Sequence, residues 1–331
     1  SIALTGCGTS SEDEVQRYSW PLATASPEDT VTQIFAEKFA EEVADLSDGK
    51  MKIQVYANST LGGDRDLLET CSDGDIPFVV QNTAPQVSFM SALAVFDLPC
   101  VFDSLDDCRK KIDDPEFYSL ISDVYTDGGY HLLGMADQGF RVMSTNKPVN
   151  SFADFKGQKI RTMENSYHLA FWKALGANPT PVAFSELYIS LSQKVVDAQE
   201  NPIANVTDKK LYEVQKYLSL TNHIYDAMPL VCNLEFFNSL PQAYQKVVQA
   251  GAIYAQEFSR FCNLEREDLI LADLADKYGM QINEVSADAR AEMAKVAQPA
   301  VIKLVAKDIG QDAVDQYMND VKDVLAQISK F

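Results

Sequence analysis

The 331-residue sequence has few of the residues and motifs that mark catalytic or metal sites. It contains only three histidines, and its six cysteines form no Cys-x-x-Cys or Cys/His spacing, which disfavours zinc and iron–sulfur sites. A glycine-rich nucleotide loop, a GxSxG motif and an HExxH motif are all missing. Since no nucleophile stands in a recognisable catalytic setting, the sequence predicts no catalytic residue, no metal and no cofactor.

Positive charge is scarce. The chain has 28 Lys and Arg residues against 48 Asp and Glu residues, for a formal net charge of −20. No basic stripe is available to bind nucleic acid, and an anionic membrane surface would repel the chain. No apolar run of 18 residues occurs either, so no transmembrane segment is predicted. If the ligand is an anion, its attraction must be local to a pocket.

The N-terminus contains the box Leu4-Thr5-Gly6-Cys7, followed by a polar stretch over residues 8–16. This resembles the end of a bacterial lipoprotein signal, in which the cysteine becomes lipidated. We therefore expect Cys7 to be a lipidation site and residues 1–16 to be a signal remnant and flexible tether. Of the other cysteines, Cys100 and Cys108 could close a short loop; alternatively all five are small buried hydrophobes.

Strands and helices alternate along the first part of the chain, which predicts a mainly parallel sheet covered by helices. The first helix is expected to begin with Ser26 as its N-cap and Pro27 at its first position. The other expected elements of this part are a strand over residues 18–24, a strand over 51–55, a helix over 64–71 and a strand over 76–80.

A second α/β round follows, with strands expected over residues 131–136, 141–145, 159–162, 195–199 and 228–233. Asn201-Pro202 is predicted to open a helix, with Asn201 as its N-cap. The stretch from Gln242 to Tyr278 is free of proline and predicts one helix long enough to join two domains. The tail is expected to form two helices broken near Pro299 and Gly310.

Two of the few arginines, Arg141 and Arg161, lie on short alternating segments that are typical of strands. The planar guanidinium group fits a carboxylate through two parallel hydrogen bonds, so arginines beside a cleft favour capture of an anion. The alternative is that each arginine simply pairs with an acidic residue of the protein.

Several longer segments, in order and spacing, resemble the solute-binding proteins of TRAP (tripartite ATP-independent periplasmic) transporters. The segments are GQKIR (157–161), ALGANPTP (174–181), AFSELY (183–188), VVDAQENP (195–202) and LYEVQKY (211–217). Upstream, LGGDR (61–65) and FDLP (96–99) continue the similarity. The resemblance covers residues 20–290.

The resemblance implies roles for eight residues. Arg161 matches the arginine that receives the ligand carboxylate as a two-pronged salt bridge. Asn201, expected at a helix N-terminus where backbone N–H groups favour an anion, matches a residue that hydrogen-bonds the same carboxylate. Arg141 matches a second ligand-contacting arginine, and Phe184 matches an aromatic ring packed on the ligand. The positions near the pocket that vary with specificity are Asp64, Asn82, Glu164 and His223.

One departure bears on specificity. Relatives that bind sialic acid carry an acid near position 82 and an asparagine near position 25, where this chain has Asn82 and Ala25. Sialic acid is therefore disfavoured, and a smaller dicarboxylate, sugar acid, keto acid or related anion is expected instead.

The resemblance implies a periplasmic binding protein-like α/β fold, with two α/β domains around a ligand cleft and a long helix bridging them. Domain I is expected over residues 17–138 and 227–265, and domain II over residues 139–226 and 266–331. The implied function is periplasmic capture of a small organic anion by a monomer that delivers it to the membrane permease subunits. The alternatives are a lipoprotein of the same fold that acts as a sensor, and a hydrolase, which would need a nucleophile.

Overall fold

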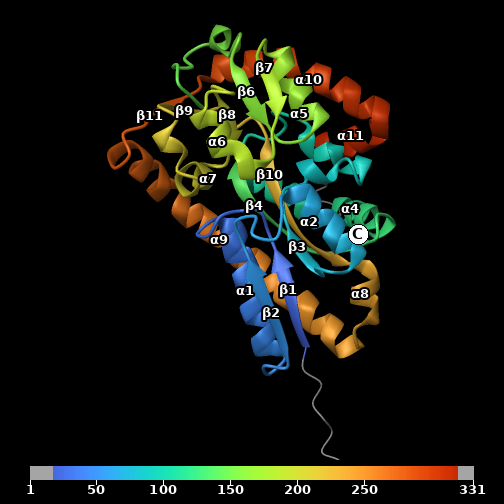
Figure 1. The fold of residues 1–331 in the computed structure, drawn as a ribbon. Helices are drawn as coiled ribbons and strands as arrows, with labels where there is room; N and C mark the ends of the chain where they lie inside the picture. The colour runs from blue at the N-terminus through green and yellow to red at the C-terminus, as the bar shows by residue number, and fades with distance from the viewer. Residues whose placement is uncertain (1–17, 320–331) are drawn as a thin grey trace, which may run out of the picture.

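A computed structural model describes residues 18–319, drawn in Figure 1. The chain forms two α/β bodies, which lie one above the other in this view. Within the described range, no helix combines the length and the apolar character that a membrane crossing requires. The predicted lipidation site Cys7 and the predicted tether over residues 1–16 lie outside the described residues.

The lower body is built on a five-stranded sheet of mixed direction. Across the sheet the strands follow the order β2 (Met51–Tyr56), β1 (Tyr18–Ala23), β3 (Phe78–Val80), β10 (Tyr225–Asn233) and β4 (Tyr130–Phe140). β1 lies parallel to β2 and β3, whereas β10 runs antiparallel to both of its neighbours. β4 therefore runs in the same direction as β1, β2 and β3, and the prediction of a mainly parallel sheet is confirmed, with β10 as the one reversed strand. β4 leads the chain out of the body and β10 brings it back, so the two must run in opposite directions.

Both faces of this sheet are covered, and the strands are buried accordingly. Along β10, Leu230 and Cys232 belong to a core packed by α1 (Val31–Leu46) and α9 (Gln242–Asp276). Val231, which points to the opposite face, belongs to a second core. This two-residue alternation with apolar side chains on both sides is typical of a central strand between helical layers.

The upper body carries a smaller sheet and a strand pair. Its four-stranded sheet has the order β11 (Gln281–Glu284), β9 (Tyr217–Leu220), β5 (Val142–Thr145) and β8 (Gln199–Asn201). The parallel pair β6 (Lys159–Thr162) and β7 (Asn178–Pro181) joins the edge of β8 through a bridge between Ile160 and Ala198.

Two strand connections, which lie side by side, link the bodies. β4 continues into β5 at Arg141, and β9 returns to β10 at Ile224. The backbone N–H of Arg141 donates to the carbonyl of Ile224 at 2.9 Å, so the two crossings are hydrogen-bonded to each other. Arg141 therefore stands at the junction of the two bodies.

The remaining helices cover the two bodies (Figure 1). They are α2 (Asp64–Asp73), α3 (Leu105–Asp113), α4 (Pro115–Asp127), α5 (Ser166–Ala174), α6 (Leu187–Ser192), α7 (Ile203–Asp208), α8 (Leu234–Ser239), α10 (Ala287–Ile309) and α11 (Gln311–Met318). Short 3-10 turns are η1 (Ala84–Gln86), η2 (Ser91–Asp97), η3 (Phe152–Phe155), η4 (Phe184–Glu186) and η5 (Leu211–Glu213).

The third connection between the bodies is α9, a single helix of 35 residues and therefore about 50 Å long. Its first half packs closely on α1: a Cβ added at Gly251 would lie 3.0 Å from Val43 Cγ2, so glycine permits this approach. Near its other end, Leu274 is buried in the core of the upper body. The prediction of one long helix that joins two domains is confirmed.

Three local predictions are wrong. α1 begins at Val31, because the Thr30 hydroxyl caps it by accepting from Gln33 N, not at Pro27 behind a Ser26 cap. Asn201 is the last residue of β8, and Pro202 occupies the N-cap position of α7. Pro299 lies inside α10 without ending it, whereas Gly310 does end it.

The five cysteines of the described range are unpaired, so a Cys100–Cys108 bridge is excluded in this structure. Cys71, Cys108 and Cys232 are buried in the cores, as expected for small apolar side chains. Burial raises the pKa of the Cys71 thiol to about 12, which keeps it in the neutral form.

Candidate ligand-binding site

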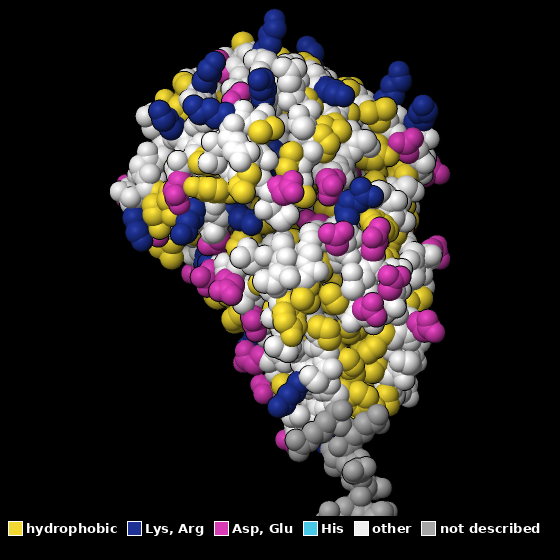
Figure 2. Space-filling view, in the orientation of Figure 1, with side chains coloured by type: hydrophobic (Ala, Val, Ile, Leu, Met, Phe, Trp, Pro, Cys, Tyr) yellow, Lys and Arg dark blue, Asp and Glu magenta, His cyan; other side chains and the backbone are white. Residues whose placement is uncertain are grey.

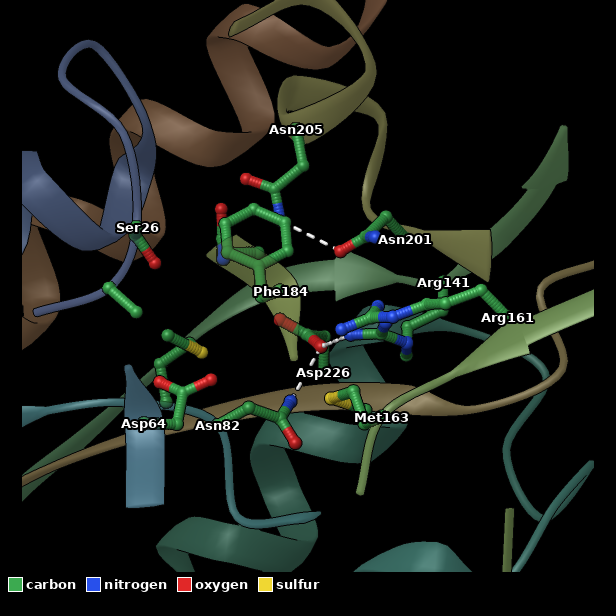
Figure 3. A pocket seen from close by; sticks show the side chains of 13 residues that line it. Ser26, Asp64, Asn82, Arg141, Arg161, Met163, Phe184, Asn201, Asn205 and Asp226 are labelled. Carbon is green, nitrogen blue, oxygen red and sulfur yellow. Dashed lines mark hydrogen bonds and ion pairs between the residues drawn. The ribbon is translucent and has the colours of Figure 1, made fainter. Parts of the chain in front are cut away.

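A pocket with an empty volume of about 350 Å³ lies between the two bodies, beside their junction (Figure 3). On the lower body it lies next to the carboxyl ends of β1 and β3, where ligands commonly bind in open α/β sheets. The lining residues are Ala25, Ser26, Asp64, Asn82, Gln138, Arg141, Arg161, Met163, Phe184, Asn201, Asn205, Asp226 and Met228.

Arg161 is held rigidly by the backbone around it. On β6, its own N–H donates to the carbonyl of Ala198 at 2.9 Å, and its side-chain Nε donates to the carbonyl of Val182 at 2.8 Å. The side chain is 1% exposed, and its Nη1 has no hydrogen-bond partner within residues 18–319. A guanidinium group has five N–H donors. Only the one on Nε is engaged, and the fork is left for another partner.

The charge of Arg161 is not balanced by a salt bridge to any described acid within 4.0 Å. Burial, and then the nearby Arg141, lower the pKa of the guanidinium to about 10. It remains protonated at neutral pH, so the pocket contains a buried positive charge whose strongest available stabilisation is an anion.

Arg141 lines the same pocket but is already paired. Its Nε and Nη2 donate to the carboxylate of Glu200, Nη2 also donates to the Glu200 carbonyl at 2.9 Å, and Nη1 donates to Asp226. One N–H on Nη1 remains of the five. Burial alone would lower the pKa of Arg141, but Glu200 and Asp226 outweigh it and raise that pKa. For Arg141, the alternative raised by the sequence, that the arginine pairs with acidic residues of the protein itself, is therefore correct.

Asn201 faces the pocket from the end of β8. Its Nδ2 donates to Gln199 Oε1 at 2.8 Å, and its Oδ1 accepts from Asn205 Nδ2 at 2.9 Å. One amide N–H is therefore free to donate to a ligand. Asn201 ends β8, and Pro202 holds the N-cap position of α7, so only the predicted N-cap position of Asn201 is wrong; the contribution of the helix N-terminal N–H groups stays a prediction.

Phe184, in η4, forms an aromatic wall of the pocket. Its ring centroid lies 5.9 Å from the Arg161 guanidinium carbon and 4.8 Å from Lys209 Nζ. Both distances are within the range of cation–π attraction. The ring helps to fix the position of Arg161 and presents an apolar face to the pocket.

On the lower body the wall is acidic. Asn82 Nδ2 donates to Asp226 Oδ1 at 2.6 Å, while Asn82 Oδ1 accepts from Ala84 N at 2.8 Å. Asp64, the first residue of α2, is half-buried in the same wall. Burial raises the pKa of Asp64 and that of Asp226 to about 6, against the opposing effect of the arginines.

Two of the eight predicted residues are not among those that line the pocket. His223 is fully buried behind it, where its ring bonds Glu200 Oε2 at 2.9 Å and Thr221 Oγ1 at 2.7 Å. Glu164 is half-buried next to Met163 and acts on the pocket by its charge, which raises the pKa of Asp64. The structure thus brings together Arg161, Asn201, Arg141, Phe184, Asn82 and Asp64, and places His223 and Glu164 outside the wall.

Sequence reasoning missed the acids that organise the site. Glu200 lies in the segment VVDAQENP (195–202), but the sequence predicts no binding role for it. In the structure it is 0% exposed and pairs with Arg141. Asp226 stands in the otherwise apolar strand Tyr225–Asn233, and a lone acid in such a run is the signal that could have identified it. Asn205, in the short helix α7 that follows β8, donates from Nδ2 to Asn201 Oδ1 at 2.9 Å and was also missed.

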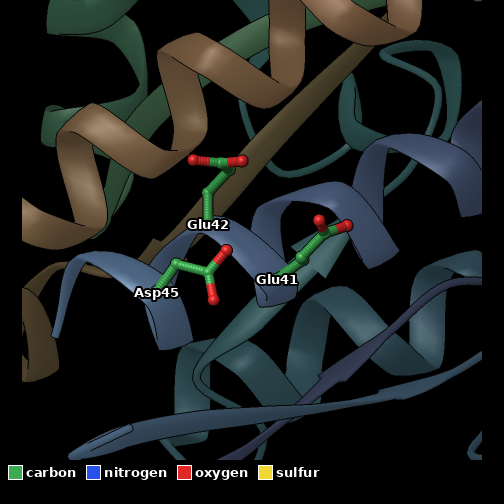
Figure 4. A group of neighbouring side chains, drawn as sticks. All are labelled: Glu41, Glu42 and Asp45. Carbon is green, nitrogen blue, oxygen red and sulfur yellow. The ribbon is translucent and has the colours of Figure 1, made fainter. Parts of the chain in front are cut away.

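A separate acidic group, which does not line the pocket, lies on α1 (Figure 4). The carboxylates of Glu41, Glu42 and Asp45 approach within 4.8 Å of one another. Lys38 Nζ lies 3.2 Å from Glu41 and 3.5 Å from Glu42, so part of this charge is compensated within the helix. These contacts are ordinary ion pairs between residues three and four apart on a helix surface.

On the face drawn in Figure 2, Lys and Arg side chains gather over the upper body, and Asp and Glu side chains gather around the waist and the lower body. With a net charge of −20, the molecule as a whole does not attract an anion. Any attraction comes from Arg161 and its immediate neighbours.

Two α/β bodies with a pocket between them, joined by two strand crossings and one long helix, define a periplasmic binding protein-like fold. The sequence model of the family described as bacterial extracellular solute-binding protein, family 7, matches residues 22–308. The chain belongs to this family, the solute-binding proteins of TRAP transporters.

Individual relatives agree with this assignment. The ectoine-binding periplasmic protein TeaA of Halomonas elongata is 30% identical over 315 residues, which cover 93% of this chain and 92% of TeaA. The sugar acid-binding protein DctPAm of Advenella mimigardefordensis, solved with galactonate, superposes with a TM-score of 0.88 at 30% identity, covering 92% of this chain and 97% of the other. A TRAP solute-binding protein of Sulfurospirillum deleyianum, solved with succinate, has a TM-score of 0.87 at 30% identity, covering 92% and 99%.

Proposed function

We propose that this protein captures a small organic acid outside the cytoplasm through a salt bridge between Arg161 and the ligand carboxylate, and delivers it to TRAP permease subunits. The observation that carries the proposal is the state of Arg161. It is a buried cation with an unpartnered Nη1 and no salt bridge to a described acid within 4.0 Å. A carboxylate would supply both the missing acceptors and the missing charge.

The other lining residues would orient the ligand. Asn201 and Arg141 each keep one free N–H on the same side of the pocket as Arg161, as Figure 3 shows for their side chains. Phe184 would pack against the ligand body.

Capture would proceed by closure of two bodies, corresponding to the predicted domains at residues 17–138 with 227–265 and 139–226 with 266–331. The pocket takes its walls from both bodies, so a ligand that bridges them stabilises the closed form over the open form. The strand crossings at Arg141 and Ile224 and the helix α9 would be the hinge elements. Delivery then needs no covalent chemistry, only recognition of the closed form by the permease.

Relatives support the ligand class without fixing the ligand. TeaA is named for ectoine, and the two solved structures hold galactonate and succinate, each of which carries a carboxylate. The family assignment supports a periplasmic location, and lipidation of Cys7 would anchor the protein there.

The test combines identification of the bound molecule with removal of Arg161. Small molecules released by denaturing the purified protein are identified by mass spectrometry, and the molecule found is titrated calorimetrically into wild type, Arg161→Ala and Arg65→Ala. Arg65 is an exposed arginine of α2 that does not line the pocket. We expect the released molecule to be an acid. Its affinity should fall by about 30-fold to several-thousand-fold in Arg161→Ala and should not change in Arg65→Ala.

A less than fivefold loss in Arg161→Ala with unaltered circular dichroism would contradict the salt bridge. A released molecule without an acidic group would contradict the ligand class.

A further inference from the structure

The pocket has hydrogen-bond donors around Arg161 on one side, the unpaired carboxylate of Asp64 on the opposite side, and acceptor oxygens on the wall between them. Arg161, with the single free N–H groups of Asn201 and Arg141, forms the donor end. Around the rest of the wall, the buried unpartnered oxygens belong to Asp226, Asn205 and Gln138. In Figure 3 Asp64 and Arg161 lie on opposite sides, with Asp226 and Phe184 between them.

The orientation of the Asn205 amide is fixed by a relay of hydrogen bonds that begins at the backbone. Gln215 Nε2 donates to two carbonyls, so its Oε1 must accept from Ser144 Oγ. Ser144 Oγ accepts from Gln199 Nε2, and Gln199 Oε1 accepts from Asn201 Nδ2. Asn201 Oδ1 in turn accepts from Asn205 Nδ2. Each amide has only one orientation in this relay, so Asn205 must present its carbonyl oxygen, which is buried and has no described partner.

Asp226 is fixed just as firmly. Its Oδ1 accepts from both Asn82 Nδ2 and Arg141 Nη1, and Asn82 is itself held by Ala84 N. Its Oδ2 is buried, and no hydrogen-bond partner for it exists within the described chain. With a pKa raised only to about 6, Asp226 is ionised at pH 7.5 and accepts hydrogen bonds but does not donate them.

Asp64 adds a second acceptor group. Its carboxylate lines the pocket, and no hydrogen bond joins it to another residue of the described range. No hydrogen bond to another described side chain fixes the orientation of the Gln138 amide. It can therefore donate to a ligand or accept from one, and it does not favour monoacids over diacids.

The charges around the pocket also disfavour a second ligand carboxylate. Arg141 and Arg161 face the carboxylates of Glu200, Asp226 and Asp64, so these five groups already carry one excess negative charge at neutral pH. One ligand carboxylate is tolerated because it meets the free fork of Arg161. A second carboxylate on the side of Asp64 would meet the Asp64 carboxylate without a lining cation to balance it, since the Ser26 hydroxyl and the Gln138 amide can donate to it but carry no charge.

We propose that the pocket selects a monocarboxylic acid whose other end carries hydrogen-bond donors, as hydroxyl or ammonium groups, and discriminates against the dicarboxylic acid of the same length. This rests on the proposed function, since it takes Arg161 as the carboxylate site. It narrows the sequence-based range of dicarboxylate, sugar acid and keto acid to acids such as aldonic acids and amino or cyclic zwitterionic acids.

Matched pairs of acids test the selection by calorimetry at pH 7.5 on protein stripped of bound ligand by unfolding and refolding. Galactonate is compared with galactarate, erythronate with meso-tartrate, and 4-hydroxybutyrate and 4-aminobutyrate with succinate. Within each set only the terminal carbon differs. We expect the monocarboxylate of each binding pair to bind at least about tenfold more tightly, because the second carboxylate of the diacid faces the carboxylate of Asp64. Comparison of 4-hydroxybutyrate with 4-aminobutyrate shows which donor is used.

A diacid that binds equally or more tightly than its partner overturns the inference, and so does a diacid as the molecule released from the purified protein. A diacid bound together with a proton on Asp64 or Asp226 would be recognised by binding enthalpies that change with the ionisation heat of the buffer, and it also counts against the inference. Failure of every acid, together with a released molecule that is not an acid, would instead remove the proposed function itself.

Asp64→Asn identifies the contribution of the far wall, with Asp66→Asn as the control on the exposed side of the same helix. Since Asn offers a donor where Asp offers only acceptors, the preference for monoacid over diacid should fall by about fivefold or more in Asp64→Asn and stay unchanged in Asp66→Asn. The affinity for 4-aminobutyrate should fall more than that for 4-hydroxybutyrate. An unchanged preference in Asp64→Asn, with normal folding by circular dichroism, contradicts this assignment of the acceptor end.

Discussion

Arg161 should reduce the stability of the ligand-free protein, and replacing it with an apolar side chain should therefore stabilise the fold while destroying ligand capture. The guanidinium is 1% exposed and has no acid within salt-bridge distance in the described chain. Arg161→Met keeps much of the side-chain length and removes the charge. Such a stability cost is typical of residues whose partner is the ligand.

The magnitude follows from the pKa. Its fall from 12.5 to about 10 corresponds to about 3 kcal/mol by which the folded protein disfavours the charged form. The substitution also removes the hydrogen bond from Nε to the Val182 carbonyl, which contributes about 1 kcal/mol. The net expectation is a gain of about 1–3 kcal/mol, or a rise in melting temperature of about 2–8 °C for domains of this size.

The assay is thermal and urea unfolding of ligand-stripped protein, with Arg109→Met as the matched control. Arg109 is also largely buried, but it forms two hydrogen bonds to the carboxylate of Asp137 at 2.8 and 3.0 Å. Its removal leaves a buried acid unpaired, so Arg109→Met should lose about 3–5 kcal/mol. If Arg161→Met were destabilised as strongly as Arg109→Met, Arg161 would have an internal partner and the account of the site would be refuted.

Three further predictions follow from the same structure. Arg161→Lys should bind the ligand about 30-fold or more weakly than wild type in calorimetry, because an ammonium group lacks both the Nε bond to Val182 and the planar fork; near-normal affinity would mean that charge alone is used. Asp64→Asn should raise the free energy of unfolding by about 1 kcal/mol at pH 7.5 but not at pH 3.5. The pKa of Asp64 is about 6 in the folded protein against a reference value of 3.8, so ionisation of Asp64 opposes folding at pH 7.5, whereas at pH 3.5 the carboxyl is largely protonated in both states. An equal gain at both pH values would contradict this assignment. Ligand should reduce the radius of gyration in small-angle scattering, and identical profiles with and without saturating ligand would argue against closure.

The local parts of the fold were predictable because they depend on neighbouring residues. The strand over residues 51–55, the helix over 64–71 and the long helix from Gln242 follow from apolar periodicity and the positions of glycine and proline. The antiparallel direction of β10 was not predictable in this way. It depends on the chain leaving one body at Arg141 and returning at Ile224, which no local pattern encodes.

The helix starts show how small competing effects decide boundaries. Ser26-Pro27 carries the usual signals of a helix start. Asp29, however, adopts a left-handed conformation with φ of 65°, which prevents a continuous helix from Pro27. Thr30 then provides the cap. Asn201-Pro202 carries the same signals, but Asn201 pairs with Val142 as the end of β8.

The site was predictable for the residues that a scarce charge or a resemblance singles out, and not for their partners. Arg161 and Arg141 were found because arginines are few and lie on strands. Their different states were hidden, because the partners of Arg141 are far away in the sequence: Glu200 is 59 residues on and Asp226 is 85 residues on. His223 lies near the pocket but turns toward Glu200, and no local pattern shows that.

The most direct test of the central claim is a crystal structure of the protein with the molecule that copurifies with it. The account predicts a carboxylate in the pocket whose two oxygens accept hydrogen bonds of about 2.7–2.9 Å from the free fork of Arg161, with the donor-bearing end of the ligand toward Asp64 and Asp226. A ligand whose carboxylate lies away from Arg161, or one that places a second carboxylate against Asp226, would contradict it.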